Sequence, residues 1–206
     1  MTDQPAVAAP SVAVVPVGKV AVEEVEAALS RAARVLRRPL ELKTALPLPQ
    51  GVEERERGQF RAAVLMARLR STFSQLGPGR MIGGESGASD KPVVRPDAIV
   101  FVTDADLFTA KSDSAFAAIL ASQRLGIVSL RRLREAFYRR TADPGKQRAR
   151  LAKELIRVVA RLTGAPECPT LECALGPTNM LADLDLKQEK LCRACSLRMF
   201  QGTVRI

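Results

Sequence analysis

The sequence predicts one compact α/β (α+β) domain with a mixed β-sheet and flanking helices. Strand-like runs of β-branched residues alternate along the chain with segments whose apolar residues recur at helical spacing. The length of 206 residues and the 47% hydrophobic content suffice for one core and would be cramped for two domains. Residues 10–206 are therefore taken as one domain, and the Pro- and Ala-rich residues 1–9 as a disordered N-terminus.

The N-terminal half predicts two strands and two helices. Residues 11–17 (SVAVVPV) form a β-branched run that predicts a strand, which Gly18 ends. Residues 22–36 repeat apolar side chains at helical spacing and predict a helix. Residues 40–46 return as a second strand, and residues 57–73 predict a second helix.

The next part of the chain predicts a loop and further alternation. Residues 77–96 are rich in Gly, Ser and Pro and predict a long mobile loop. Residues 97–103 (DAIVFVT) are a continuous apolar run, typical of a central strand, and residues 126–130 predict another. Residues 148–162 predict a helix that ends at Gly164.

The composition excludes several kinds of site. The chain has no His, so neither a catalytic triad nor a His-containing zinc site can form. The net charge of +10 leaves nucleic-acid binding open. However, arginines spread along predicted helices favour solvated faces, and no run of aromatic side chains offers a stacking platform. These arginines are Arg31, Arg34, Arg37, Arg61, Arg68, Arg70, Arg148 and Arg150.

The sequence also bears on location. The first residues, MTDQP, lack a basic region and a long apolar stretch, so no signal peptide is predicted. No apolar run reaches the length of a membrane span. The expected compartment is the cytoplasm, where thiols stay reduced.

Four cysteines near the C-terminus have the spacing of a metal site. Cys168 and Cys173 form a C-x4-C pair, and Cys192 and Cys195 form a C-x2-C pair. Two close pairs in a reduced compartment indicate a tetrahedral Zn(Cys)4 site, with disulfides or chance burial of four thiols as the alternatives. Such a closed site leaves no position for water or substrate, so one structural zinc ion that organises residues 165–206 is expected.

Three segments of the chain carry a recognisable pattern. They are ELIRVVARLTGAPECPTLECALGPTNMLADLDLKQEKLCRAC, VTDADLF and GIVSLRRLREAFY. They resemble the archaemetzincin family of zinc metallopeptidases, which carries a zinc-binding helix HExxHxxGxxHC, followed by C-x4-C, a Met and a final CxxC. The resemblance implies a zincin-like fold with a zinc-stapled C-terminal lobe.

In that register the catalytic positions are degenerate. Arg157 and Arg161 stand at the first two His positions, Val158 at the general-base Glu, and Glu167 at the third His. Leu175 replaces the family's Met. An arginine has no lone pair to donate to a metal, and a valine accepts no proton. The resemblance therefore implies a protein without the family's zinc hydrolysis.

Arg157 and Arg161 are interpreted as a solvated helix face. Alternatively, they bind an anion or acidic peptide in the former cleft, or pair with Glu167 and fill it. Val158 is interpreted as core.

Other polar residues give no alternative catalytic constellation. Asp104 and Asp106 are interpreted as turn formers rather than metal ligands, and Asp183 and Asp185 as structural. Ser129 lacks a His partner.

Three hypotheses follow from the sequence. The first is a non-catalytic archaemetzincin-like protein that retains a structural zinc, whose former cleft binds a peptide or protein, or nothing. The second is a hydrolase or peptidase with relocated chemistry. The third is a nucleic-acid-binding zinc module.

Overall fold

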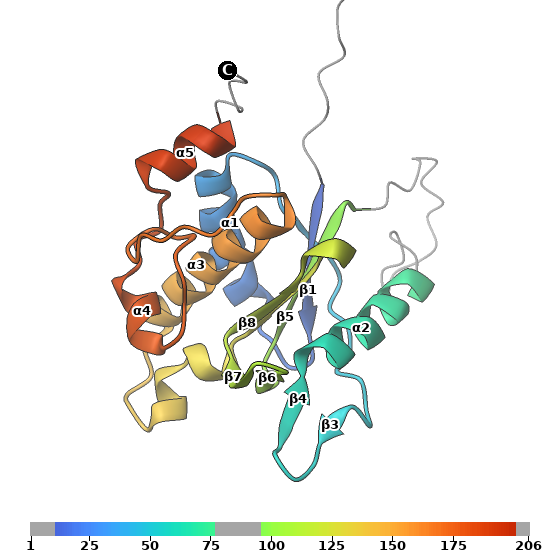
Figure 1. Cartoon of the computed structure of the whole chain (residues 1–206). Coiled ribbons are helices and arrows are strands. Elements are labelled where there is room, and N and C mark those ends of the chain that lie inside the picture. The colour runs from blue at the N-terminus through green and yellow to red at the C-terminus, as the bar shows by residue number, and fades with distance from the viewer. Residues whose placement is uncertain (1–10, 77–95, 201–206) are drawn as a thin grey trace, which may run out of the picture.

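The computed structural model describes residues 11–76 and 96–200. Its centre is a five-stranded sheet (Figure 1). Four neighbouring strands are parallel, and the last is antiparallel to its neighbour, so the sheet is mixed as predicted. In spatial order the strands are β2 (Glu41–Leu42), β1 (Val12–Val17), β5 (Ala98–Thr103), β9 (Leu125–Ser129) and β8 (Ala117–Leu120).

Three long helices cover the sheet. Helices α1 (Val22–Leu36) and α3 (Pro144–Leu162) pack on one face, and α2 (Ala62–Leu76) packs on the other (Figure 1). Strand β1 serves both cores, because Val14 packs toward α1 while Val15 and Val17 pack toward α2. No helix within the described ranges is long and apolar enough to cross a bilayer.

Smaller elements complete the domain. A second sheet contains four short strands: β3 (Glu53–Glu54), β4 (Gln59–Arg61), β6 (Leu107–Thr109) and β7 (Ser112–Ala115). Three 3-10 turns are η1 (Ala121–Gln123), η2 (Arg131–Leu133) and η3 (Glu135–Tyr138). The C-terminal lobe carries only two short helices, α4 (Leu181–Leu186) and α5 (Arg193–Phe200).

The helix expected over residues 57–73 begins late. Residues Gln59–Arg61 are instead strand β4, which pairs with β3 and with β6, and the helix starts at Ala62. The third helix begins earlier than predicted, at Pro144, because the Asp143 side chain accepts from the backbone N–H of Lys146.

The remaining strand predictions have mixed outcomes. The strand expected over 40–46 shrinks to Glu41–Leu42 and an isolated bridge at Leu46.

The predicted N-terminal disorder lies outside the described residues, as does nearly all of the predicted mobile loop, whose last residue is Pro96.

Gly126 allows α3 to approach strand β9 closely. A Cβ atom at this position would collide with Val158 Cγ1 and lie 3.2 Å from Leu162 Cδ1. Gly126→Ala is therefore expected to lower the free energy of unfolding by about 1–3 kcal/mol, since the packed helix must shift. Chemical denaturation checks this, and adding Val158→Ala should recover part of the loss. An unchanged denaturation midpoint in the single variant would refute the close approach.

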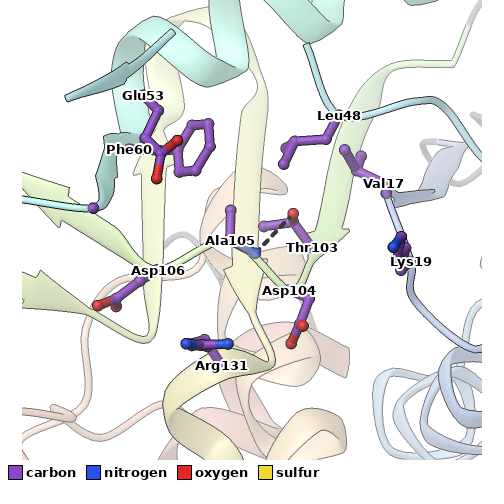
Figure 2. A pocket seen from close by; sticks show the side chains of 12 residues that line it. Val17, Lys19, Leu48, Glu53, Phe60, Thr103, Asp104, Ala105, Asp106 and Arg131 are labelled. Atoms are coloured by element: carbon purple, nitrogen blue, oxygen red, sulfur yellow. Dashed lines mark hydrogen bonds between the residues drawn. The ribbon is translucent and has the colours of Figure 1, made fainter. Parts of the chain in front are cut away.

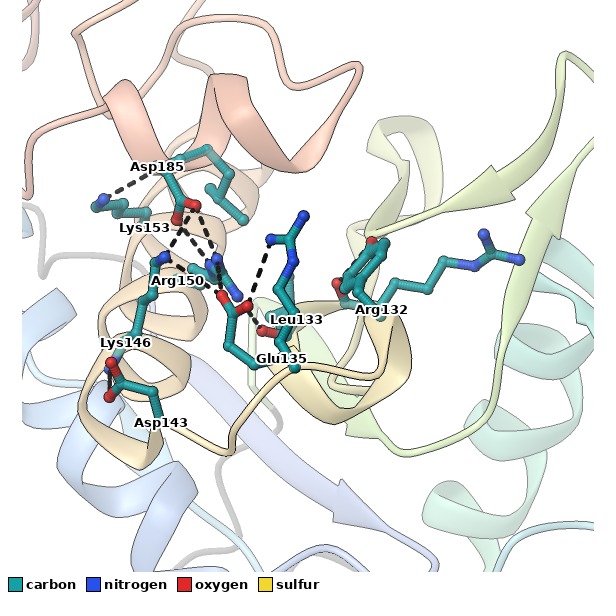
Figure 3. Close-up of polar contacts among 11 residues, drawn as sticks. Arg132, Leu133, Glu135, Asp143, Lys146, Arg150, Lys153 and Asp185 are labelled. Atoms are coloured by element: carbon teal, nitrogen blue, oxygen red, sulfur yellow. Dashed lines mark hydrogen bonds and ion pairs between the residues drawn. The ribbon is translucent and has the colours of Figure 1, made fainter.

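Arg150 lies within the protein, contrary to its interpretation as part of a solvated face. Its side chain is 1% exposed and donates to Asp185 Oδ1 at 2.7 Å, to Glu135 Oε1 at 2.5 Å and to the Leu133 carbonyl at 2.7 Å (Figure 3). Lys146 also pairs with both carboxylates. This network joins α3 to η3 and α4, and it satisfies a guanidinium that would otherwise be costly to bury.

Candidate metal centre

The four cysteines come together at one point in the C-terminal lobe. Their sulfur atoms all lie within 4.8 Å of one another, and Cys168 Sγ is 3.7 Å from Cys192 Sγ. A tetrahedron with Zn–S bonds of about 2.3 Å has edges of about 3.8 Å, so the spacing suits a bound ion. All four thiols are free rather than disulfide-bonded. The cluster is therefore able to bind a metal.

Backbone hydrogen bonds shape the first cysteine pair. The Cys168 N–H donates to the Leu175 carbonyl at 3.2 Å, and the Gly176 N–H donates to the Cys173 carbonyl at 2.8 Å. A Cβ at Gly176 would lie 2.5 Å from the Thr170 carbonyl oxygen, so a side chain does not fit this turn. The turn directs both thiols of the pair toward one point.

Further backbone contacts join the two cysteine pairs. The Ala174 N–H donates to the Lys190 carbonyl at 3.0 Å, and the Gln188 N–H donates to the Glu172 carbonyl at 2.8 Å. These bonds hold the two loops side by side, although 18 residues separate Cys173 from Cys192.

The surroundings of the thiols differ. The backbone N–H of Cys195 lowers the pKa of the Cys192 thiol to about 7, so thiolate is accessible at neutral pH. Burial raises the pKa values of Cys173 and Cys195. The Cys192 N–H also donates to Cys173 Sγ at 3.3 Å. Amide donors of this kind stabilise sulfur ligands that carry negative charge.

Arg157 is committed to an internal ion pair. Its side chain is 14% exposed, and Nη2 lies 2.6 Å from Oε2 of Glu154, whose side chain is fully buried. The interpretation of Arg157 as part of a solvated face is therefore wrong. Arg161 is half-buried and donates through Nη1 to the Ala165 carbonyl at 3.0 Å, which satisfies a carbonyl just beyond the helix end.

Glu154 connects α3 to the segment after Cys173. Thr178 Oγ1 donates to its Oε1 at 2.9 Å. Lys187 Nζ donates to Thr178 Oγ1 and, at 2.6 Å, to the Gly176 carbonyl. Burial alone would raise the pKa of Glu154, but Arg157, Lys187 and Thr178 together hold that pKa below its usual value. Burial lowers the pKa of the Lys187 ammonium to about 8.

Val158 and Glu167, the other two positions singled out by the resemblance, do not form a metal site with Arg157 and Arg161. Val158 is fully buried against β9, as predicted for a core residue. Glu167 is exposed, and within the described residues it forms no ion pair with Arg157 or Arg161. Across residues 11–76 and 96–200, the cysteine cluster is the one group of three or more His, Cys, Asp or Glu that could hold a metal ion.

The four aspartates singled out in the sequence are structural. Asp104 pairs with Arg134, and Asp106 accepts from Arg132 Nε at 2.6 Å and Nη2 at 2.8 Å. Asp185 holds Arg150, while Asp183 accepts from two backbone N–H groups at the start of α4.

Ser129 is not a candidate nucleophile either. It is buried and donates through Oγ to the Ala105 carbonyl at 2.6 Å.

Sequence reasoning missed Glu154 as the partner of Arg157, and it missed Thr178 and Lys187 as residues that act on Glu154. Glu154 stands three residues before Arg157, a spacing that places two side chains on one helix face, so this signal was present. The contributions of Thr178 and Lys187 depend on a loop that returns to α3, which no local pattern indicates.

The fold matches solved structures over nearly its whole length. A zinc-dependent peptidase from Methanocorpusculum labreanum superposes with a TM-score of 0.78 at 20% identity, covering 92% of this chain and 100% of that one. An archaemetzincin from Methanopyrus kandleri gives a TM-score of 0.68 at 21% identity, with 93% and 94% covered. These likenesses define a mixed α/β domain of the archaemetzincin type.

Sequence comparison places the chain within a family. Residues 90–201 match Peptidase family M54, and the chain belongs to that family. The archaemetzincin of Saccharolobus solfataricus is 33% identical over 100 residues, which cover 48% of this chain and 54% of that protein. That of Thermococcus kodakarensis is 27% identical over 105 residues, covering 51% and 56%. The chain therefore spans about half the length of the curated relatives it matches.

Proposed function

We propose that this chain is a non-catalytic member of Peptidase family M54, in which one structural zinc ion bound by Cys168, Cys173, Cys192 and Cys195 supports the C-terminal lobe. The observation that carries the proposal is the Arg157–Glu154 pair on helix α3. In the register of the resemblance, a guanidinium bound to a buried carboxylate stands where the first catalytic imidazole would donate to the metal. When bound, zinc supplies four strong Zn–S bonds and no Lewis-acid position open to substrate.

The charge around the cysteines also suits this role. Four thiolates and a divalent cation carry a net charge of −2. The buried ammonium of Lys187 lies close enough to Cys173 to interact electrostatically with it. A nearby cation offsets the negative charge of such a site and favours its burial.

Two measurements on the purified chain test the proposal. Elemental analysis is expected to give about one zinc per chain. Hydrolysis of a panel of short peptides is expected to stay at the rate of the buffer, with and without added zinc. The Methanocorpusculum labreanum zinc-dependent peptidase serves as the positive control. Two zinc ions per chain, or no zinc at all, would contradict the proposal.

An active hydrolase with relocated chemistry would give a different result. Its peptide hydrolysis would disappear with a chelator, and would be lost in Arg157→Ala or Glu167→Ala if the old helix still contributed. The idea that the former cleft receives a peptide or protein remains a prediction. The guanidinium of Arg157 already pairs with Glu154, so Arg157 has little positive charge left to attract an acidic peptide.

A further inference from the structure

The sheet contains a topological switch point between β1 and β5. From the carboxyl end of β1 the chain leads through α1 to β2 on one side, whereas from the carboxyl end of β5 it leads through β6 and β7 to β8 and β9 on the other side. The segments that leave the carboxyl ends of β1 and β5 therefore diverge. In open α/β sheets, ligands bind in the crevice outside the strand ends at such a point.

A pocket of about 510 Å³ lies at these strand ends, within the size range of about 300–1,000 Å³ usual for small-molecule sites. Val17 comes from the end of β1, Ala105 follows β5, and Leu48 and Phe60 give further apolar surface (Figure 2). None of the four α3 and C-terminal positions discussed above (Arg157, Val158, Arg161 and Glu167) lines this pocket. Val158 packs at Gly126 near the start of β9, while the pocket contains Arg131, which follows the end of β9.

The charged side chains that line the pocket differ in whether another residue already pairs with them. Asp106 is occupied by Arg132 and also accepts from Gln59 at 3.1 Å, while Asp104 is occupied by Arg134. The cations Lys19 and Arg131 are exposed in the lining.

Neither Lys19 nor Arg131 has an ion-pair partner within the described part of the chain. Glu53 lies across the pocket from Lys19 and Arg131 (Figure 2). Its carboxylate likewise has no ion-pair partner within the described residues. One positive charge is therefore left over among the uncommitted side chains.

We propose that this pocket binds a small organic anion. Its carboxylate or phosphate group is held by Lys19 and Arg131, and its apolar or aromatic portion packs on Leu48 and Phe60. Arginine and lysine are the usual partners of carboxylate and phosphate groups. An organic anion also gains affinity by packing its apolar portion on this wall, which an inorganic ion cannot do. The site is independent of the cysteine cluster and of any peptide hydrolysis.

Amide NMR titration of the zinc-loaded chain tests this site. Phenyl phosphate and phenylacetate are the probes, and they separate a phosphate ligand from a carboxylate ligand. Saturable shifts are expected at the backbone amides of Gly18, Lys19, Ala105 and Arg131. Lys19→Gln/Arg131→Gln should weaken binding by roughly tenfold or more, since two charged contacts are lost. Glu53→Gln should strengthen it severalfold by removing a repulsive charge.

A matched control keeps the change in net charge the same. Lys111→Gln/Arg198→Gln alters two exposed cations outside the pocket lining and should leave the affinity unchanged. Thermal unfolding of each variant verifies that all of them fold. The proposal is overturned if benzylamine binds as tightly as phenylacetate, if Lys19→Gln/Arg131→Gln retains full affinity, or if neither anion shifts the pocket amides.

Discussion

Replacing Cys195 with serine is expected to reduce bound zinc from one ion per chain to a small fraction and to unfold much of the segment from residue 165 onward. Structural zinc sites in small domains contribute an apparent binding free energy of about 10–16 kcal/mol at neutral pH, which far exceeds what the two short helices here can supply. Elemental analysis and limited proteolysis measure both effects. The expected fragment extends from the N-terminal region to the end of α3.

The structure explains why this loss should stay in one lobe. Cys168, Cys173 and Cys195 are buried on the face of the core that α1 and α3 share, but α4 and α5 contain only six and eight residues. Helices of that length are marginal without packing or a metal. The central sheet keeps its apolar contacts with α1 and α2 and should keep its protection from proteolysis. Helix α3 should be less stable than in the unaltered chain, because Arg150 and Glu154 lose their contacts with Asp185 and Thr178.

Ser196→Ala is the matched control for the cysteine variant. It changes the neighbouring residue of the same helix and removes no sulfur ligand, so zinc content and the cleavage pattern should match those of the unaltered chain. If Cys195→Ser kept a full zinc ion and resisted proteolysis equally well, the cluster would not be the metal site.

The central elements of the fold follow from local patterns. Residues 22–36 were predicted as a helix with the bounds that α1 has, because apolar side chains recur on one face. Continuous apolar runs likewise predicted β1, β5 and β9. Strand β4 was missed because its three residues run directly into α2 and are too few to show an alternating pattern. Its partner β3 is nearby in the sequence, but its other partner β6 lies 47 residues further along the chain and leaves no local signature.

The candidate site was likewise predictable from the sequence only in part. Cysteine spacing was enough to predict that four thiols meet, because thiolate chemistry restricts what such a pattern can do. The burial of Arg150 and Arg157 was not predictable from composition. A charged side chain is buried only when partners surround it, and the partners of Arg150, Glu135 and Asp185, come from distant segments. Arg157 pairs with the nearby Glu154, but Glu154 is itself supported by Thr178, which lies 24 residues further along the chain.

Arg157→Met is expected to destabilise the protein by about 3–5 kcal/mol, because it leaves the buried carboxylate of Glu154 without its guanidinium. Glu154→Gln in the same chain should restore much of that loss, since an uncharged amide is cheaper to bury than an unpaired carboxylate. Arg161→Met is the matched control. It removes a hydrogen bond to one carbonyl and should cost about 1 kcal/mol. Denaturant unfolding at neutral pH measures all four proteins.

Acid titration gives an independent test of the same pair. The pKa of Glu154 lies below its ordinary value of 4.5 in the folded chain, so its ionised form stabilises the fold. For a carboxyl group of this kind, the contribution is fully present above pH 4.5 and is lost as the pH falls through the folded-state pKa. The unfolding free energy of the unaltered chain should therefore exceed that of Glu154→Gln most at pH 6–7, and the excess should shrink below about pH 4.5. Protonation of the cysteines affects both proteins alike and cancels in the difference. A difference that stays constant from pH 7 to pH 3 would show that Glu154 is not held as an ion by Arg157 and Lys187.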